Sequence, residues 1–286
     1  MTIVEEARAK VNLALHVSGR RPDGYHDLDM LVAFADVGDS VELTTSEADR
    51  FLIDGPMAAS LSTDADNLVQ RALKGFREIT GRTDPLSIRL TKRLPVASGI
   101  GGGSADAAAT LRALCRLHDV PADAPALAAL ALSLGADVPM CIASSPARVG
   151  GVGERIVPTT GHLCFGLLLV NPNVGVSTPA TFRALERRDN PPLPPLPVFD
   201  TVRRLADFLA AETRNDLEPA ARTIAPVIGD VLTALADLPD VRLTRMSGSG
   251  ATCFGLFDDK ATANRAALKL APKHPGWWIE PAAATF

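Results

Sequence analysis

A glycine-rich segment in the first half of the chain carries the clearest chemical signal in the sequence. From Pro95 to Ala105 the chain reads PVASGIGGGSA, with four glycines within the five positions 99–103. Glycine lacks a Cβ and tolerates positive φ, so its backbone N–H groups can approach a ligand closely. The alanine-rich stretch that follows predicts a helix over 105–117, whose unpaired N–H groups and dipole favour anions. Together they predict a phosphate-binding site.

The common nucleotide-binding templates do not fit this segment. A P-loop requires a lysine after its glycines, and the dinucleotide fingerprint requires a third glycine where Ser104 stands. The chain contains no D-F-G triplet, which excludes the protein-kinase pattern. A flexible surface linker is the alternative, but a strand pattern over 87–90 precedes the glycines and a helix pattern follows them. We therefore expect another class of phosphate-binding loop.

Two charged residues could act on a phosphoryl group. Asp137 follows a predicted helix that ends at Gly135 and precedes Pro139, so it is presented from a short turn. It could take a hydroxyl proton as a general base, or it could cap the next segment. Lys10 shares a strand face with Asn12. It could hold Asp137, lower the pKa of a substrate hydroxyl or stabilise the transferred group, and the sequence does not separate these roles.

Two further segments could contact a substrate. Tyr25, the only tyrosine in the chain, precedes His26 and follows a turn signal at Asp23 and Gly24. An aromatic ring can stack on a pyrimidine and an imidazole can bond its edge, although a buried Tyr-His pair is the alternative. Residues 246–251 read MSGSGA, which is also compatible with a plain hairpin turn.

Three of these segments, in this order, resemble motifs of the GHMP kinases. The resemblance rests on AKVNL at 9–13, the loop at 95–105 and MSGSGA at 246–251. Within that superfamily, DGYH at 23–26 and GADVP at 135–139 are similar to the kinases of a cytidylylated methylerythritol in non-mevalonate isoprenoid biosynthesis. One departure is Ala105, where many members carry a second serine, so one hydroxyl contact to phosphate is absent.

The resemblance implies an ATP-dependent kinase that phosphorylates the 2-hydroxyl of this alcohol, with Lys10 and Asp137 as catalytic residues. It implies that Tyr25 and Phe182 sandwich the cytosine while His26 reads its edge, with plain helix core as the alternative for Phe182. Mg²⁺ is expected with ATP, and no metal ligands are predicted. The other implied substrate contacts are Asn12, Gly248 and Ser249, and the implied ATP contacts are Pro95, Val96, Ala97, Ser98, Gly99, Ile100, Gly101, Gly102, Gly103, Ser104 and Ala105.

The order of predicted strands and helices is irregular, which favours an α+β protein of two domains over a doubly wound sheet. The resemblance implies an ATP-binding domain like ribosomal protein S5 domain 2 over 1–157 and a ferredoxin-like domain over 158–286 that completes the substrate cleft. Predicted strands include 2–17, 28–34, 40–45, 165–171, 241–246 and 253–257; predicted helices include 67–80, 124–134, 178–187, 202–211, 218–223, 227–235 and 261–270. A loop with five prolines is predicted over 190–197.

Composition bounds the remaining possibilities. The 286 residues are 47% apolar with net charge −4, which suits a large core and argues against nucleic acid as a partner. No apolar run reaches membrane length and no signal peptide is evident, so we expect a cytoplasmic protein without a membrane partner, monomeric or homodimeric. Four cysteines without a C-x-x-C pair predict buried free thiols: Cys115, Cys141, Cys164 and Cys253.

Three other functions are compatible with parts of this pattern. A mevalonate or homoserine kinase would share the glycine loop, but residues 24–26 and the triple glycine argue against it. A nucleotide-binding sensor without catalysis would not require Lys10 and Asp137. An RNA-binding protein with an S5-like fold would carry a basic stripe, which this acidic chain lacks.

Overall fold

The computed structural model describes residues 1–64, 66–159 and 163–286. The chain forms two compact units, each assembled from separated segments. Unit 1 comprises Met1–Ala9, Gly38–Val96 and Gly101–Ser144, and unit 2 comprises Lys10–Val37, Ala97–Ile100 and Ser145–Phe286. The chain therefore passes from one unit to the other five times, and three of these passages fall inside the segments predicted to do chemistry.

The strands of unit 1 are parts of two long strands and two shorter strands. Strand β1 (Thr2–Arg20) pairs with β2 (His26–Thr45), and both continue into unit 2. Residues 40–45 of β2 pair antiparallel with β4 (Leu86–Thr91), which pairs parallel with β3 (Arg50–Asp54). Alternate residues of β4 are buried, as the period of two in a strand requires.

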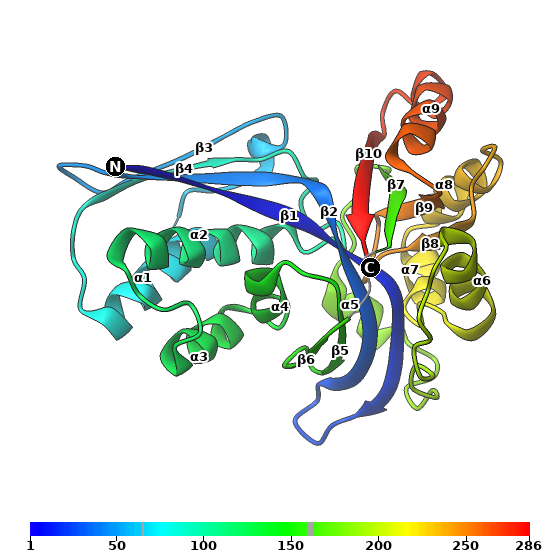
Figure 1. Ribbon diagram of the computed structural model, residues 1–286, viewed down its shortest axis with the longest axis horizontal. Coiled ribbons are helices and arrows are strands. Elements are labelled where there is room, and N and C mark those ends of the chain that lie inside the picture. Colours follow the sequence, from blue (N-terminus) through cyan, green and yellow to red (C-terminus); the bar gives the residue numbers. More distant parts are fainter. Residues whose placement is uncertain (65, 160–162) are drawn as a thin grey trace. The chain divides into compact units, whose positions relative to one another are not determined.

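The helices of unit 1 lie on one face of these strands (Figure 1). They are α1 (Leu68–Thr80), α2 (Gly102–His118), α3 (Pro125–Leu134) and the short α4 (Val138–Ala143). Asn67 caps α1 by accepting the N–H of Val69, and Gly81 ends it with φ of 70°. The small residues of α2, among them Ala105 and Ala107 to Ala109, are buried and allow close helix packing.

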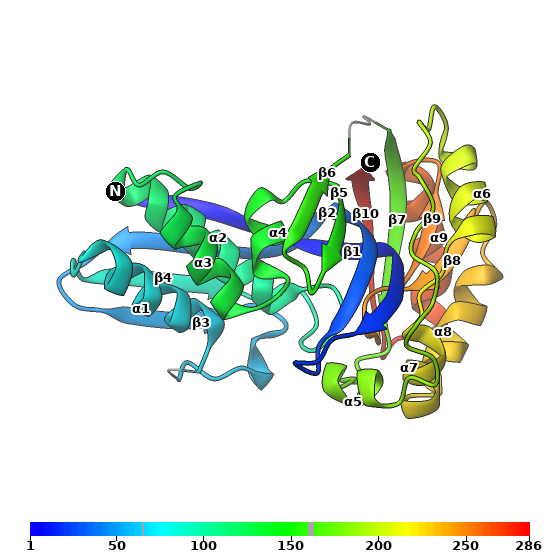
Figure 2. The ribbon, with the colours of Figure 1, turned by 90° about the horizontal axis from the view of Figure 1, so that it is seen from below.

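Unit 2 is built on antiparallel strands with helices on one face. Strand β7 (Cys164–Asn171) lies between β10 (Trp278–Thr285) and β9 (Cys253–Phe257), and β9 pairs with β8 (Leu243–Met246). The N-terminal half of β2 pairs with β5 (Ala147–Gly151), which pairs with β6 (Arg155–Pro158). Helices α8 (Val227–Ala236) and α9 (Lys260–Leu270) pack on β7–β9–β8 (Figure 2), and the others are α5 (Thr178–Arg183), α6 (Val202–Glu212) and α7 (Glu218–Ile224).

The proline-rich loop over 190–197 has no regular structure, as predicted. It is nevertheless anchored, because Arg148 donates to the carbonyls of Leu193 and Pro194 and forms a two-point ion pair with Asp29. Asp29 in turn accepts the N–H of Leu193, whose side chain is buried. The partly buried ion pair therefore fixes the loop against β2 and β5.

The observed elements confirm the α+β class and most of the predicted segments. Strand β2 is continuous, whereas the sequence predicted two strands separated near Gly38. The glycine does not turn the chain there: a Cβ on it would lie 2.3 Å from the carbonyl oxygen of Ala7, so it permits a close strand approach. Strands β3, β5, β6 and β10 and helix α4 were not predicted, and α5 ends four residues earlier than expected.

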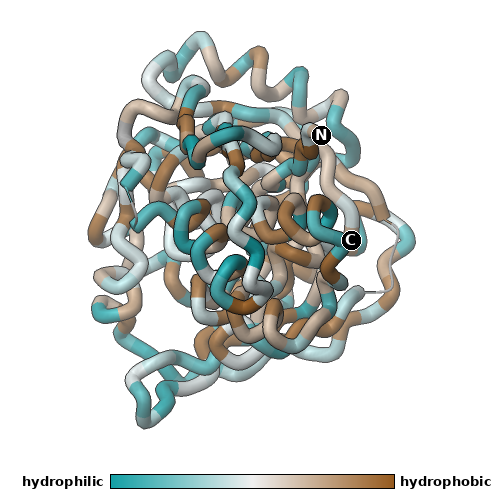
Figure 3. The backbone as a smooth tube through the Cα atoms, turned by 90° about the vertical axis from the view of Figure 1, so that its left-hand side faces the viewer, coloured by the Kyte–Doolittle hydropathy of each residue, from teal (hydrophilic) through white to brown (hydrophobic). Residues whose placement is uncertain are grey.

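The cysteine prediction is wrong at one position. None of the four cysteines is in a disulfide, and Cys115, Cys141 and Cys253 are buried. Cys164 is exposed, because it is the first residue of β7. In Figure 3 hydrophobic (brown) and hydrophilic (teal) stretches alternate along the backbone. Within the described residues, no helix combines the length and apolar character needed to cross a membrane.

Gly166 on β7 provides a test of unit 2. A Cβ there would lie 2.1 Å from the carbonyl oxygen of Asp259, the residue that caps α9. We expect Gly166→Ala to lower the free energy of unfolding by about 1–3 kcal/mol or more, because strand and helix must move apart. Urea unfolding measures this change. Gly175→Ala is the control, since its Cβ meets nothing within 4 Å; equal stability of the two variants would contradict the close approach.

Candidate active site

The hydroxyl of Ser247 connects three of the predicted motifs within unit 2. The N–H of Asn12 donates to Ser247 Oγ at 3.0 Å, and Ser247 Oγ donates to the carbonyl of Gly99 at 3.1 Å. Asn12 and Ser247 are fully buried. One side chain thus joins β1, the first part of the glycine loop and the turn between β8 and β9.

Two glycines allow the loop and the turn to approach this closely. Gly99 has φ of 75°, and a Cβ on it would lie 2.5 Å from the carbonyl oxygen of Ser247. Gly248 has φ of 55°, and its Cβ would lie 2.6 Å from the carbonyl oxygen of Gly99. Both positions therefore exclude other residues by conformation and by space. The N–H of Thr252, donating to Ser98 at 3.1 Å, adds a further backbone link.

Lys10 is buried beside these motifs. Its ammonium donates to Asn12 Oδ1 at 2.8 Å, and its N–H donates to the carbonyl of Ile100 at 3.0 Å. Only 4% of its surface is exposed, whereas a lysine on a polar strand face is usually solvated. The burial of an ammonium beside the glycine loop is consistent with a site for negatively charged groups.

The glycines at the end of the loop form the first turn of α2. The helix begins at Gly102, three residues earlier than predicted, with Gly101 as its N-cap at φ of 68°. No side chain caps this end. The first-turn N–H groups belong to Gly102, Gly103 and Ser104, so an anion can reach them without a side chain in the way.

Asp137 lies in a turn of unit 1 that is close to the start of α2. A Cβ built on Gly135 would lie 3.8 Å from Ser104 Oγ and 3.7 Å from a methyl of Val138. Asp137 is the N-cap residue of α4, but its side chain makes no capping hydrogen bond to that helix. The capping role considered for its carboxylate is therefore not the one observed.

The rings of His26 and Phe182 are stacked, with centroids 4.9 Å apart and an angle of 21° between planes. Phe182 is half-buried, so it is not the plain helix core considered as its alternative. Within the described part of the chain, the buried Nε2 of His26 has no hydrogen-bond partner. Burial, with the nearby charges of Arg188 and Arg20, lowers the pKa of His26. The pair therefore contains a buried imidazole nitrogen without a hydrogen-bond partner among the described residues, while Tyr25 beside it is 64% exposed.

Ser249 connects the β8–β9 turn to the helix that carries Phe182. Its hydroxyl lies 2.7 Å from the hydroxyl of Thr178 at the start of α5. The carbonyl of Gly248 accepts from the side-chain amide of Asn215, which is also buried. Unit 2 thus gathers Lys10, Asn12, residues 97–100 and the turn at 247–250. Sequence reasoning placed Ser247 in a motif but did not identify its bridging role, and it missed Asn215 entirely.

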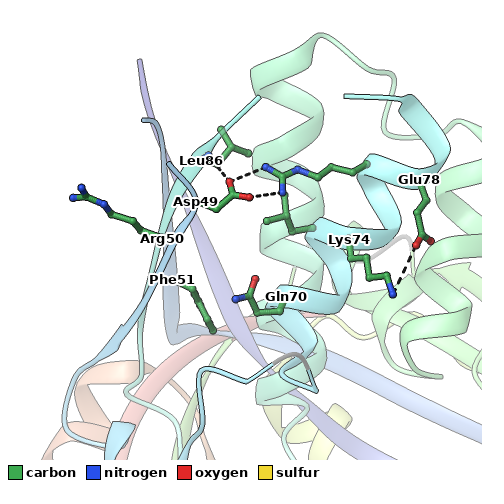
Figure 4. A pocket seen from close by; sticks show the side chains of 9 residues that line it. Asp49, Arg50, Phe51, Gln70, Lys74, Glu78 and Leu86 are labelled. Atoms are coloured by element: carbon green, nitrogen blue, oxygen red, sulfur yellow. Dashed lines mark hydrogen bonds and ion pairs between the residues drawn. The ribbon is translucent and has the colours of Figure 1, made fainter. Parts of the chain in front are cut away.

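Unit 1 also contains a cavity of about 370 Å³ between β3, β4 and α1 (Figure 4). The two-point ion pair of Arg77 with Asp49 lies in it, and the hydrogen bond from Arg77 lowers the pKa of Asp49 to about 2. Lys74 and Glu78 form a longer pair at 3.9 Å. None of the predicted site residues lines this cavity, so we assign it no part in the candidate site.

Comparison with known proteins agrees with these motifs. The family model described as GHMP kinases N terminal domain matches residues 67–145, and GHMP kinases C terminal matches 197–275. A 4-diphosphocytidyl-2-C-methyl-D-erythritol kinase of Cereibacter sphaeroides is 54% identical over 96% of this chain and 97% of its own. The kinase of the same name from Paramagnetospirillum magneticum is 50% identical over 97% and 96%.

The chain belongs to the 4-diphosphocytidyl-2-C-methyl-D-erythritol kinase family of GHMP kinases.

Solved structures agree with this family. A crystal structure of 4-(cytidine 5'-diphospho)-2C-methyl-D-erythritol kinase matches with a TM-score of 0.80 and 33% identity, covering 99% of this chain and all of that one. A homoserine kinase from Cytophaga hutchinsonii matches with a TM-score of 0.72 over 99% of this chain and 95% of its own. Its identity of 19% supports the shared GHMP fold alone. The two-domain GHMP kinase fold is therefore confirmed.

The bridge through Ser247 can be tested directly. Ser247→Ala leaves the buried N–H of Asn12 without its acceptor, so we expect a loss of about 1–3 kcal/mol of stability. Thermal and urea unfolding measure it. Ser133→Ala is the control, because its exposed hydroxyl bonds only the carbonyl of Leu130 and should change stability by less than about 0.5 kcal/mol. A Ser247→Ala protein as stable as this control would refute the bridge.

Proposed function

We propose that the protein transfers the γ-phosphoryl group of ATP to the 2-hydroxyl of 4-diphosphocytidyl-2-C-methyl-D-erythritol, in non-mevalonate isoprenoid biosynthesis. The single observation that carries the proposal is the meeting of three motifs at the Ser247 hydroxyl, in a chain of this kinase family. A kinase of this family uses ATP as its phosphoryl donor. Measuring ADP release with this alcohol, with mevalonate and with homoserine tests the substrate.

We propose that the loop over 95–105 binds the ATP phosphates. The uncapped first turn of α2 and the positive φ at Ala97, Gly99 and Gly101 support this proposal, because they leave N–H groups open to an anion. Such contacts depend on the backbone, so Ala105 does not abolish them. ATP arrives as its magnesium complex, and Mg²⁺ keeps waters and phosphate oxygens as ligands.

In the proposed reaction, Asp137 accepts the proton of the substrate hydroxyl. The hydroxyl oxygen forms its bond to the γ-phosphorus, and the bond from that phosphorus to the bridging oxygen breaks as ADP leaves. Lys10 would neutralise negative charge on the transferred group or lower the pKa of the hydroxyl. Its hydrogen bond to Asn12 supports a fixed position for the ammonium. The absence of a helix cap on the Asp137 carboxylate supports a role other than capping.

We propose that Tyr25, His26 and Phe182 recognise the cytosine. The unsatisfied Nε2 of His26 and the lowered pKa of its ring support a neutral imidazole that bonds the edge of the base. His26 itself stacks on Phe182, so the base has to displace it or extend the stack. Asn12, Gly248 and Ser249 would contact the rest of the alcohol, since Ser249 is tied to the helix of Phe182 through Thr178.

Several coarser expectations accompany this function. We propose a cytoplasmic enzyme whose partners are ATP and its alcohol, without nucleic acid or membrane, acting as a monomer or homodimer. The division into an ATP-binding domain over 1–157 and a second domain over 158–286 that completes the substrate cleft also remains a prediction. The two compact units described above follow contacts along a different division of the chain.

The base role of Asp137 predicts a specific loss of turnover. Asp137→Asn keeps the size of the side chain but removes its charge, so kcat should fall by about 10²–10⁴-fold. ATP binding, measured by calorimetry, should persist, because the loop is unchanged. Asp123→Asn, at an exposed carboxylate of the same unit, is the control. A folded Asp137→Asn enzyme with near wild-type turnover would leave positioning and Lys10 as the sources of catalysis.

The recognition role of His26 predicts a change in KM for one substrate only. His26→Ala should raise the KM for the cytidylylated alcohol by roughly 10- to 100-fold, the cost of a lost buried hydrogen bond. The KM for ATP should stay nearly constant. His274→Ala is a matched control, since His274 also stacks on an aromatic ring, Trp277, at 3.8 Å. If the KM for ATP rises instead, His26 serves the other substrate.

A further inference from the structure

A buried cluster of three charged side chains lies within unit 1 and has no part in the function proposed so far. The ammonium of Lys92 forms ion pairs with Asp39 and, at 2.8 Å, with Asp106. The three side chains are between 0% and 5% exposed. Two carboxylates and one ammonium carry a net charge of −1 when all are ionised, which is costly in a buried place. Such a cluster requires an explanation beyond stability.

The cluster connects the two ends of the glycine loop. Lys92 stands three residues before Pro95, where the loop begins, and Asp106 is the fifth residue of α2, which begins directly after Gly101. The hydrogen bond from Lys92 to Asp106 therefore closes the base of the loop across 14 positions of the sequence. Closing a loop in the folded state removes alternative conformations of its tip.

Asp39 fixes the entering strand of the loop in a second way. Its Oδ1 accepts the N–H groups of Arg93 at 2.6 Å and Leu94 at 2.9 Å, while its Oδ2 accepts from Lys92. These are the residues between β4 and the loop, so the backbone there has little freedom. On the other side, a Cβ on Gly102 would lie 3.4 Å from the Lys92 ammonium. The first residue of α2 thus rests directly on the cluster.

We propose that Lys92 is a positioning residue for ATP, which clips the chain entering the phosphate loop to the helix leaving it. The clip holds the first-turn N–H groups of α2 in place before ATP arrives, so that binding does not have to order them. This inference rests on the proposed function of the loop, which it deepens. Lys92 acts through the backbone and is not itself a catalytic residue.

The protonation of Asp106 provides a measurement, the pH dependence of ATP affinity, that a purely structural role of the cluster would not affect. Its Oδ1 has no hydrogen-bond partner among the described residues. Burial, opposed by attraction to Lys92 and reinforced by repulsion from Asp39, raises the pKa of Asp106 to about 8. Below that pH the cluster is neutral; above it the ionised carboxylate adds negative charge beneath the start of α2. ATP affinity should therefore fall as the pH rises through about 8.

The experiment compares Lys92→Met, Asp106→Leu and Asp106→Asn at pH 7. The first two break the clip, and we expect the KM for ATP to rise by about 10- to 100-fold while kcat at saturating ATP changes much less. Asp106→Asn keeps an oxygen that can accept from Lys92, so its KM should return to within about threefold of the wild-type value. The same variant should lose the fall in ATP affinity above pH 8, measured by calorimetry.

Arg77→Met is the matched control, because it removes the two-point ion pair with Asp49 elsewhere in unit 1 (Figure 4). It should lower the melting temperature without changing the KM for ATP. If Lys92→Met behaves like this control, the positioning role is refuted. If Lys92→Met does not fold, the difference between Asp106→Leu and Asp106→Asn decides: an equal KM for ATP in both variants overturns the proposal.

The two proposals fail in different ways. A wild-type protein that binds ATP but transfers no phosphoryl group to the cytidylylated alcohol contradicts the proposed substrate. ATP calorimetry on the Lys92 and Asp106 variants remains decisive for the clip in that case, since it needs no acceptor. Unchanged ATP affinity in all three variants, in an enzyme that phosphorylates the alcohol, overturns the clip and leaves the kinase function intact.

Discussion

The approach of two glycine backbones is the constraint on which the site in unit 2 depends. Gly99 and Gly248 come so close that each needs the space a Cβ would occupy, and each has positive φ. Only at this separation can the Ser247 hydroxyl accept from Asn12 and donate to Gly99 at once. The buried Lys10 and Asn12 are placed by the same contact, since both neighbour these backbones. The hydrogen bonds and the position of the buried ammonium at the candidate site therefore depend on the lack of a Cβ at Gly99 and Gly248.

Each of the two units contributes a different kind of group that favours anions. In unit 1 the start of α2 offers backbone dipoles, which need no counter-charge and no desolvated side chain. In unit 2 the ammonium of Lys10 is buried and donates to the side-chain amide oxygen of Asn12. A kinase uses both, because backbone donors suit a bound triphosphate and a fixed ammonium suits the negative charge on the transferred phosphoryl group. The presence of backbone donors and of a buried ammonium is consistent with the kinase family to which the chain belongs.

Sequence patterns predicted what local chemistry determines. The α1 boundary follows from the Asn67 cap, and β9 was predicted to the residue because a mostly apolar segment follows the turn at 247–250. The glycine loop was predicted from residue types and their order, whereas the catalytic roles of Lys10 and Asp137 were implied by the resemblance and stay predictions. Strand β10 and the true extent of β2 were missed, since tertiary partners stabilise them rather than local propensity. Likewise, nothing in the sequence indicates that Asp39, Lys92 and Asp106 meet, because their spacing has no period and only the fold brings them together.

The position of β10 has a consequence for how the chain is made. This strand ends one residue before the C-terminus, yet it pairs along its whole length with the central β7 and at Ala284 with Ala35 of β2. During synthesis, the sheet of unit 2 cannot be completed until the codons for residues 278–285 have been translated and this strand has left the ribosome. Pairings between the two ends of a chain also slow folding, since they close the longest loops. Nascent chains are therefore exposed to chaperones and proteases until this strand has been made, and loss of residues 278–285 removes a strand from the middle of a sheet.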